Sequence, residues 1–278
     1  MEKVQNDFYL INDEKKVVSS FNDDFLMKGK SLYEVIRIIA GVPIFLSEHL
    51  VRLNNSAMLI GVKLPLSEDE VKKRLKDMIN INNCSFGNIK IVFNYNGLNC
   101  DFYCYFLQHK YPEEKDYISG VKTISYNGER ENPNAKVMNI NFRSSVDTQI
   151  KKAGAYEAIL IDGVGNVTEG SKSNIFMVKG DKVITAPIKA VLPGITRGIV
   201  IDIVKFLGFT LCEEYVCFEN ISQMDGLFIT GTSPKVLPIN KVDDMQFSSS
   251  SNELICKIQK EYNNKIESYI LQNTSLKK

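Results

Sequence analysis

The order of the predicted elements limits the fold more than any other feature of this sequence. Short β-prone runs such as FYLIND and VVSSF open the chain, helical patterns follow, and strands return at EAILID, NIFMVKG and GLFITG. Strands and helices are therefore mixed in two unequal blocks. The regular β-α-β alternation of a doubly wound parallel sheet is missing, so the sequence predicts an α+β fold.

Several predicted elements are marked at their ends. Ser67 and Glu70 have the spacing of a capping box, and Ser47 is expected to cap the helix before it. The runs NIKIVFNYN and DFYCYFLQ predict a hairpin around Gly97. The run IVIDIVKFLG is expected to form a helix that Gly208 ends.

With 278 residues, the chain is long enough for about two domains. The segment HKYPEEKDYISG is charged, contains a proline and lacks periodicity, which favours a domain boundary. We predict a smaller N-terminal domain over residues 1–113, a linker over 114–120 and a larger C-terminal domain over 121–278. Residues 254–270 carry an apolar stripe at helical spacing, which predicts an amphipathic packing helix.

The charge balance argues against nucleic-acid and membrane partners. The chain has 34 Lys and Arg against 33 Asp and Glu, a formal charge of +1, whereas such partners require a basic excess. Its apolar runs fall short of the ~18 residues that a membrane helix needs. The N-terminal run MEKVQNDFYLINDEKK has no apolar signal segment, so we expect a cytoplasmic protein.

Cysteines and histidines give little support to metal or triad chemistry. The six cysteines are scattered, none forms a Cys-x-x-Cys pair, and we interpret them as reduced thiols. Only His49 and His109 are present, so a histidine-based metal site or a Ser/His triad is poorly supplied. We therefore expect no metal.

Two glycine-containing runs are poor nucleotide-binding motifs. In GVGNVT at 163–168, threonine takes the place of the third glycine of a dinucleotide loop, and polar residues follow it. GTSPK at 231–235 lacks the Gly-x4-Gly-Lys-Ser/Thr pattern. Neither run indicates a nucleotide enzyme.

The most informative stretch is VTEGSKSNIFMVKGDKVITAPIKAVLPGITRG. It combines Glu169, an Asn-apolar-aromatic triplet at 174–176, Thr185 and a Gly-Ile-Thr-Arg run at 194–197. This combination resembles the signature of the class IV pyridoxal-phosphate aminotransferases. That family contains branched-chain aminotransferases, D-amino-acid aminotransferases and aminodeoxychorismate lyases.

The resemblance extends over most of the chain. YEVIR at 33–37 and HLVR at 49–52 resemble motifs in the N-terminal half of the family. AKVMN at 135–139 resembles its lysine motif, and GTS at 231–233 resembles its last phosphate-binding turn. The resemblance implies the two-domain fold of the D-amino-acid aminotransferase-like enzymes, pyridoxal 5'-phosphate as cofactor, and a homodimer.

Lys136 is the residue that the resemblance assigns to catalysis. A pyridoxal enzyme needs a lysine amine that holds the cofactor as an imine and later moves a proton. Free lysine titrates near ~10.4, so the site must favour the uncharged amine. Lys136 stands between a polar loop and an apolar stretch, a plausible place for a semi-buried lysine, and the alternative is a solvated surface lysine.

The remaining cofactor residues that the resemblance implies are Arg52, Glu169, Ile195, Thr196, Thr232 and Ser233. A carboxylate such as Glu169 keeps the ring nitrogen protonated, and Arg52 is a forked cation for the phosphate. The predicted helix that starts at Ile195 offers unpaired N–H groups to the same anion. Taken singly, Glu169 is equally a turn or cap residue, and Arg52 a solvated helix residue.

On the substrate side, the candidates are Tyr33, Arg37 and Lys90. Tyr33 is an aromatic neighbour of the substrate or a plain strand residue, and Arg37 orients carboxylates or pairs with a neighbour. Lys90 replaces an arginine as carboxylate partner, or it is an outward-facing strand lysine. His49 is expected to pack or to make a structural hydrogen bond.

We predict transamination between an amino acid and a 2-oxo acid, most like the branched-chain type. The arginine of D-amino-acid enzymes is missing at 95–97, which reads YNG, and the hydroxyl expected of a lyase is missing at Val35. Ile140 and Lys172 depart from the branched-chain pattern. Two alternatives therefore stay open: an aminodeoxychorismate lyase that makes p-aminobenzoate and pyruvate, and a non-catalytic relative that acts as a binding module.

Overall fold

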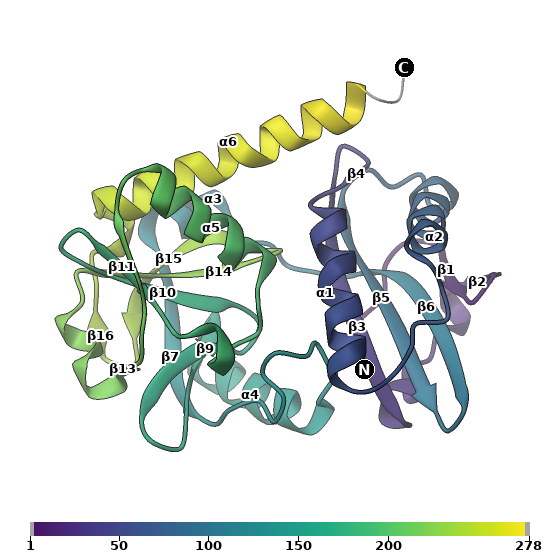
Figure 1. Ribbon diagram of the computed structural model, residues 1–278, viewed down its shortest axis with the longest axis horizontal. Coiled ribbons are helices and arrows are strands. Elements are labelled where there is room, and N and C mark those ends of the chain that lie inside the picture. The colour runs from purple at the N-terminus through teal and green to yellow at the C-terminus, as the bar shows by residue number, and fades with distance from the viewer. Residues whose placement is uncertain (1–2, 276–278) are drawn as a thin grey trace. The chain divides into compact units, whose positions relative to one another are not determined.

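The structure is a computed structural model that describes residues 3–275 (Figure 1). Contacts within the chain divide it into two compact units. The first unit contains the chain up to Lys110, the segment Ala135–Ile140 and the chain from Ile266 onward. The second unit contains Tyr111–Asn134 and Asn141–Lys265.

The first unit is built on a six-stranded antiparallel sheet with the order β2-β1-β6-β5-β3-β4. Its strands are β1 (Phe8–Ile11), β2 (Glu14–Val17), β3 (Lys30–Ile39), β4 (Val42–Pro43), β5 (Gly87–Asn96) and β6 (Asn99–Leu107). The short 3-10 helices η1 (Val18–Ser20) and η2 (Asp24–Met27) follow β2. The hairpin predicted around Gly97 is confirmed as β5 and β6.

Helices α1 (Leu46–Leu59) and α2 (Glu68–Ile81) pack on one face of this sheet (Figure 1). Leu53 of α1 and Leu75 of α2 are almost fully buried in the same cluster as Phe93 of β5. Because side chains alternate along a strand, Tyr33 points to the opposite face, where it joins the aromatic cluster that includes Tyr105.

The two helices begin in different ways. The capping box before α2 is confirmed, since Ser67 Oγ accepts from Glu70 N at 3.3 Å and Ser67 N donates to Glu70 Oε2 at 2.8 Å. The prediction that Ser47 caps α1 is wrong. This helix follows Phe45, which has a left-handed backbone (φ 53°, ψ 41°) and makes no side-chain cap. The Phe45 ring is buried and packs edge-on against Tyr269 at 4.9 Å, so tertiary packing sets this helix start.

The second unit contains a ten-stranded mixed sheet in which β16 pairs with β15 beside the path β12-β11-β10-β14-β15-β7-β8-β9-β13. The strands are β7 (Val121–Asn127), β8 (Glu157–Ile161), β9 (Asn166–Gly170), β10 (Asn174–Lys179), β11 (Lys182–Thr185), β12 (Thr210–Glu213), β13 (Val216–Cys217), β14 (Gly226–Gly231), β15 (Lys235–Val242) and β16 (Met245–Gln246). The GVGNVT run turns from β8 into β9, and no helix follows it. With mostly antiparallel pairs and separate helices, the α+β prediction is confirmed.

The helices of the second unit are α3 (Glu114–Ser119), α4 (Ile140–Ala153), α5 (Ile195–Phe206) and α6 (Glu253–Ser275), with the 3-10 helices η3 (Ile188–Ala190), η4 (Phe218–Gln223) and η5 (Ser249–Ser251). Residues 114–120, predicted as a linker, form α3 and the turn at Gly120. The predicted amphipathic helix is confirmed as α6, whose Ile255, Ile258 and Tyr262 are buried. Helix α6 is shared, since its residues from Ile266 onward belong to the first unit.

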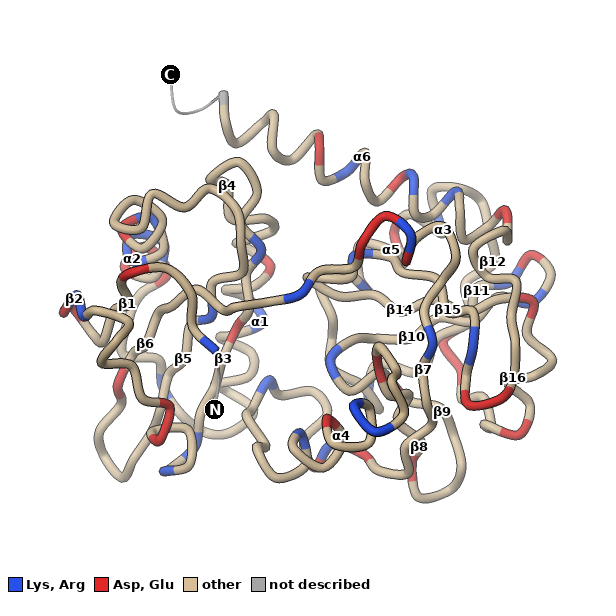
Figure 2. Tube along the Cα trace, turned by 180° about the vertical axis from the view of Figure 1, so that it is seen from behind, with Lys and Arg blue, Asp and Glu red and all other residues tan. Residues whose placement is uncertain are grey.

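Charged residues of both signs occur along the elements of each unit, as Figure 2 shows. Along α6, for example, lysines and glutamates are interspersed. Among the helices of residues 3–275, none is long and apolar enough to cross a membrane.

The capping box at the start of α2 can be tested with a pair of serine-to-alanine variants. We expect Ser67→Ala to lower the free energy of unfolding by about 1 kcal/mol, because it removes the acceptor for the Glu70 amide at the start of α2. Ser47→Ala, at an exposed position near the start of α1, is expected to change it by less than about 0.5 kcal/mol. Urea unfolding of both variants measures the difference, and equal losses would contradict the capping assignment.

Candidate active site

Lys136 is fixed to the first unit through its backbone. The amide of Tyr33 donates to the Lys136 carbonyl at 3.2 Å, and the amide of Met138 donates to the Ser31 carbonyl at 2.9 Å. The Lys136 amide donates to Ser56 Oγ of α1 at 3.1 Å. Segment 136–138 thus continues the sheet beside β3, where the two-residue strand β4 pairs only with residues 38 and 39.

The amine of Lys136 lies over an aromatic ring. Its Nζ is 4.7 Å from the Tyr33 ring centroid, within the range of a cation–π contact, and the residue is half-buried. The alternative of a solvated surface lysine is therefore wrong. Lys90 Nζ lies 4.8 Å from the same centroid, and only 1% of Lys90 is exposed. The outward-facing alternative for Lys90 is also wrong, and two amines share the Tyr33 ring.

Arg52 is oriented by a buried carboxylate. Its Nε and Nη2 donate to the two oxygens of Glu34 at 2.8 and 2.7 Å, in forked geometry. Arg52 is buried, so it is not the solvated helix residue considered above. His49, one turn earlier on α1, brings Nδ1 to 2.7 Å from Glu34 Oε2, which confirms its predicted structural hydrogen bond.

Electrostatics decide the charge states of this cluster. Burial raises the pKa of Glu34, but the charge of Arg52 and the hydrogen bonds from Arg52 and His49 outweigh it, so the pKa lies far below its usual range. Burial lowers the pKa of His49, against the opposing effect of Glu34. Glu34 is therefore ionised and His49 neutral at physiological pH, with Nδ1 as the donor.

Arg37 and Lys90 lie on the same sheet face as Tyr33. Arg37 follows Tyr33 by four residues along β3, so the period of two places both side chains on one face. Its guanidinium lies 4.4 Å from the Phe86 ring centroid and the residue is 9% exposed. The structure thus groups the three predicted substrate residues on the aromatic face of the first unit.

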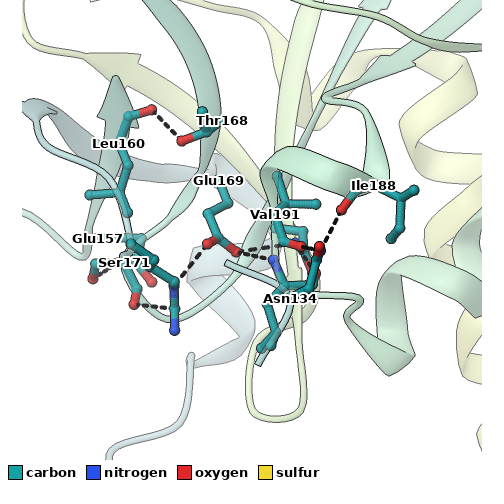
Figure 3. Close-up of polar contacts among 11 residues, drawn as sticks. Asn134, Glu157, Leu160, Thr168, Glu169, Ser171, Ile188 and Val191 are labelled. Atoms are coloured by element: carbon teal, nitrogen blue, oxygen red, sulfur yellow. Dashed lines mark hydrogen bonds and ion pairs between the residues drawn. The ribbon is translucent and has the colours of Figure 1, made fainter. Parts of the chain in front are cut away.

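In the second unit, Glu169 is a buried strand residue and not the turn or cap residue considered above. It lies in β9 and is 2% exposed (Figure 3). Arg130 Nε lies 2.8 Å from Glu169 Oε1. Glu169 Oε2 accepts from the Leu192 amide at 3.2 Å and from Asn174 Nδ2 at 3.4 Å. The carboxylate is therefore held on both oxygens and faces a neighbouring guanidinium.

The turn after Glu169 is fixed by a second carboxylate (Figure 3). Ser171 Oγ donates to Glu157 Oε1 and Ser173 Oγ to Glu157 Oε2. Arg130 Nη2 also donates to the Ser171 carbonyl at 3.0 Å. Lys172, which departs from the branched-chain pattern, pairs with Asp147 of α4 at 2.5 Å and is exposed.

The predicted phosphate segments of the second unit are two tight backbone turns. Helix α5 begins at Ile195 after Gly194, where a Cβ would lie 2.0 Å from Asn174 Oδ1. Thr196, in the first turn of α5, is 4% exposed. Thr232 and Ser233 are half-buried in the turn between β14 and β15.

A buried hydroxyl beside these turns fits an anionic ligand. Thr230 is 1% exposed, and its Oγ1 has no hydrogen-bond partner among the residues that the structure describes. It stands directly across from Asn174 in the β10–β14 pair. Because a buried hydroxyl without a partner is costly, this group and the open N–H groups of α5 suit the phosphate of pyridoxal phosphate.

Four further functional candidates were not predicted from the sequence, namely Glu34, Arg130, Asn174 and Thr230. The pairing of Glu34 was predictable in principle. An acidic residue in a buried strand needs a cationic partner, and the following helix carries His49 and Arg52. Asn174 was recognised as part of the Asn-apolar-aromatic triplet, but no role was assigned to it. Nothing in the local pattern around Arg130 marks it as the partner of Glu169.

Comparison with known proteins identifies the family. Residues 31–242 match the family model of the amino-transferases of class IV. The chain is 32% identical to D-alanine aminotransferase of Bacillus licheniformis over 236 residues, 80% of this chain and 82% of that protein. It is 30% identical to a putative branched-chain-amino-acid aminotransferase of Methanocaldococcus jannaschii over 265 residues, 90% of this chain and 91% of that protein.

Solved structures share the fold. The branched-chain aminotransferase of Escherichia coli superposes with a TM-score of 0.85 at 24% identity, covering 94% of this chain and 95% of that one. A putative 4-amino-4-deoxychorismate lyase of Legionella pneumophila reaches 0.78 at 23% identity, covering 88% and 95%. The chain belongs to the class IV aminotransferase family, whose members are pyridoxal-phosphate enzymes, as the sequence predicted.

The Glu34 cluster has a stability consequence. We expect Glu34→Gln to lower the unfolding free energy of the cofactor-free protein at pH 7 by roughly 3–5 kcal/mol, because it leaves Arg52 as a buried cation without its carboxylate. Glu48→Gln, at an exposed site on the same helix, is the control, with a change below about 0.5 kcal/mol.

The difference in unfolding free energy between wild type and Glu34→Gln depends on pH in one predicted direction. The folded-state pKa of Glu34 is depressed, so its stabilisation is complete above the ordinary glutamate pKa and is lost as pH falls toward the folded value. The gap between wild type and Glu34→Gln is therefore expected to be constant from pH 7 to 8 and to narrow below about pH 4. A gap that widens in acid would contradict the ionised assignment.

Proposed function

We propose that this chain catalyses transamination between an amino acid and a 2-oxo acid with pyridoxal phosphate, most like the branched-chain type. The observation that carries the proposal is the placement of Lys136. Its backbone is pinned to β3 and to α1, and its amine lies over Tyr33 in the unit that also holds the oriented Arg52. Family membership supports this reading.

The proposed cofactor site uses residues with separate tasks. Arg52 would bind the phosphate, together with the N–H groups of Ile195 and Thr196 and the turn of Thr232 and Ser233. Glu169 would hold the proton on the ring nitrogen, supported by Arg130. When bound, the cofactor supplies an electron sink for the α-carbon of the substrate.

Lys136 would act as both the acid and the base of the reaction. In the first half-reaction its Nζ takes the proton from the α-carbon of the amino acid. In the second half-reaction the same nitrogen returns a proton to the α-carbon derived from the 2-oxo acid. Its fixed backbone limits the positions that the amine can reach, so its proton transfers are directed to one carbon.

Tyr33, Arg37 and Lys90 would meet the substrate. Lys90 is a fully buried amine on the face that carries Tyr33, so it is placed to meet the carboxylate of a substrate. The relatives named above act by name on D-alanine and on branched-chain amino acids, so both substrate classes are candidates. By resemblance to the family, we also propose a cytoplasmic homodimer.

A substrate panel tests this function. We expect the cofactor-loaded protein to transfer the amino group of L-valine or L-leucine to 2-oxoglutarate, and to release no pyruvate from aminodeoxychorismate. D-alanine with 2-oxoglutarate is the matched test for the other stereochemistry. Product formation is followed by chromatography of the amino acids.

The other outcomes of the panel are equally informative. Formation of pyruvate and p-aminobenzoate without any transamination would contradict the proposal and indicate the lyase reaction. A similar structure, from Legionella pneumophila, is named as a putative lyase of this kind. A protein that stays colourless with added cofactor and converts nothing would indicate a non-catalytic binding module. Transfer from D-alanine alone would overturn the branched-chain assignment.

A further inference from the structure

We propose that helix α6 is part of the phosphate-binding machinery of the second unit, and that Tyr262 is a positioning residue which directs the hydroxyl of Thr196 toward the phosphate. The proposal rests on the proposed function, because it takes Thr196 as a phosphate ligand. It adds a residue from a helix that carries no part of the family motifs quoted above.

One face of α6 contacts both phosphate segments. Gln259 Nε2 donates to the Val236 carbonyl at 3.2 Å, immediately after the β14–β15 turn. Tyr262 OH lies 3.3 Å from Thr196 Oγ1 in the first turn of α5. Because residues three apart on a helix share a face, α6 holds the two segments against one surface.

A third contact connects the end of this turn to α6 through a side chain. Lys235, which follows the Thr232–Ser233 turn, has a left-handed backbone with φ 56°, a conformation that non-glycine residues rarely adopt. Its Nζ donates to Oδ1 of Asn263, the neighbour of Tyr262, at 3.2 Å. The strained turn is therefore tied to the same helix that reaches Thr196.

Either oxygen of the Tyr262–Thr196 pair can donate, and we take the Tyr262 phenol as the donor. Burial raises the pKa of Tyr262 to about 12, against the lowering effect of the hydrogen bond to Thr196, so the phenol keeps its proton at physiological pH. A phenol that donates to Thr196 Oγ1 occupies one lone pair of that oxygen. The threonine proton is then left to point toward an acceptor such as a phosphate oxygen.

The arrangement predicts an effect that depends on the phosphate group. Without Tyr262 OH, Thr196 is free to rotate, and its hydroxyl loses part of its interaction with the anion. We expect Tyr262→Phe to weaken the binding of pyridoxal phosphate about three- to tenfold. The binding of pyridoxal, which lacks the phosphate, is expected to change less than about twofold.

The experiment titrates the cofactor-free full chain with each of the two ligands and follows absorbance. The variants are Tyr262→Phe, Thr196→Val, Thr196→Ser and the double variant Tyr262→Phe/Thr196→Val. Tyr269→Phe, which removes a hydroxyl from the same helix in the first unit, is the matched control. We expect Tyr262→Phe to add nothing in the Thr196→Val background and Thr196→Ser to retain the Tyr262 effect.

The outcomes separate this inference from the proposed function. If Thr196→Val weakens both ligands equally, Thr196 is not at the phosphate, and the proposed cofactor site fails. If Thr196→Val is selective for pyridoxal phosphate but Tyr262→Phe is not, or if the two effects add in the double variant, the cofactor site stands and the role of Tyr262 is overturned. Thermal unfolding of each variant shows whether a structural loss explains a change that both ligands share.

Discussion

The pairing of residues 136–138 with β3 is the interaction on which the candidate site depends. Strand β4 is too short to cover β3, and this leaves backbone groups of β3 to be satisfied by another segment. The chain returns there from the second unit, so a residue distant in sequence meets Tyr33 and α1. A lysine on a free loop would have no fixed direction, whereas Lys136 is held at its own amide and carbonyl.

A buried carboxylate paired with an arginine occurs in each unit. In the first unit Glu34 aims Arg52, and in the second unit Arg130 supports Glu169. A buried ion pair repays its desolvation only with good geometry and further hydrogen bonds, which His49 and the Leu192 amide supply. Both pairs therefore fix the direction of a charged group that the proposed chemistry uses.

Elements with local sequence signals could be predicted from the sequence, whereas contacts that only tertiary structure creates could not. The capping box at Ser67, the helix after Gly194 and the hairpin at Gly97 were predictable because neighbouring residues determine them. The start of α1 was not, because Phe45 is positioned by a ring more than two hundred residues away. The burial of Lys90 and the partnership of Arg130 with Glu169 escaped prediction for the same reason.

The most direct test of the account is to locate the lysine that binds the cofactor. Borohydride reduction of the loaded protein, followed by digestion and mass spectrometry, attaches the pyridoxyl group permanently to the lysine that held it. The account predicts the label on Lys136, its loss in Lys136→Ala and its retention in Lys151→Ala, an exposed control on α4. A label on Lys90, the other amine over the Tyr33 ring, or on any other lysine would contradict it.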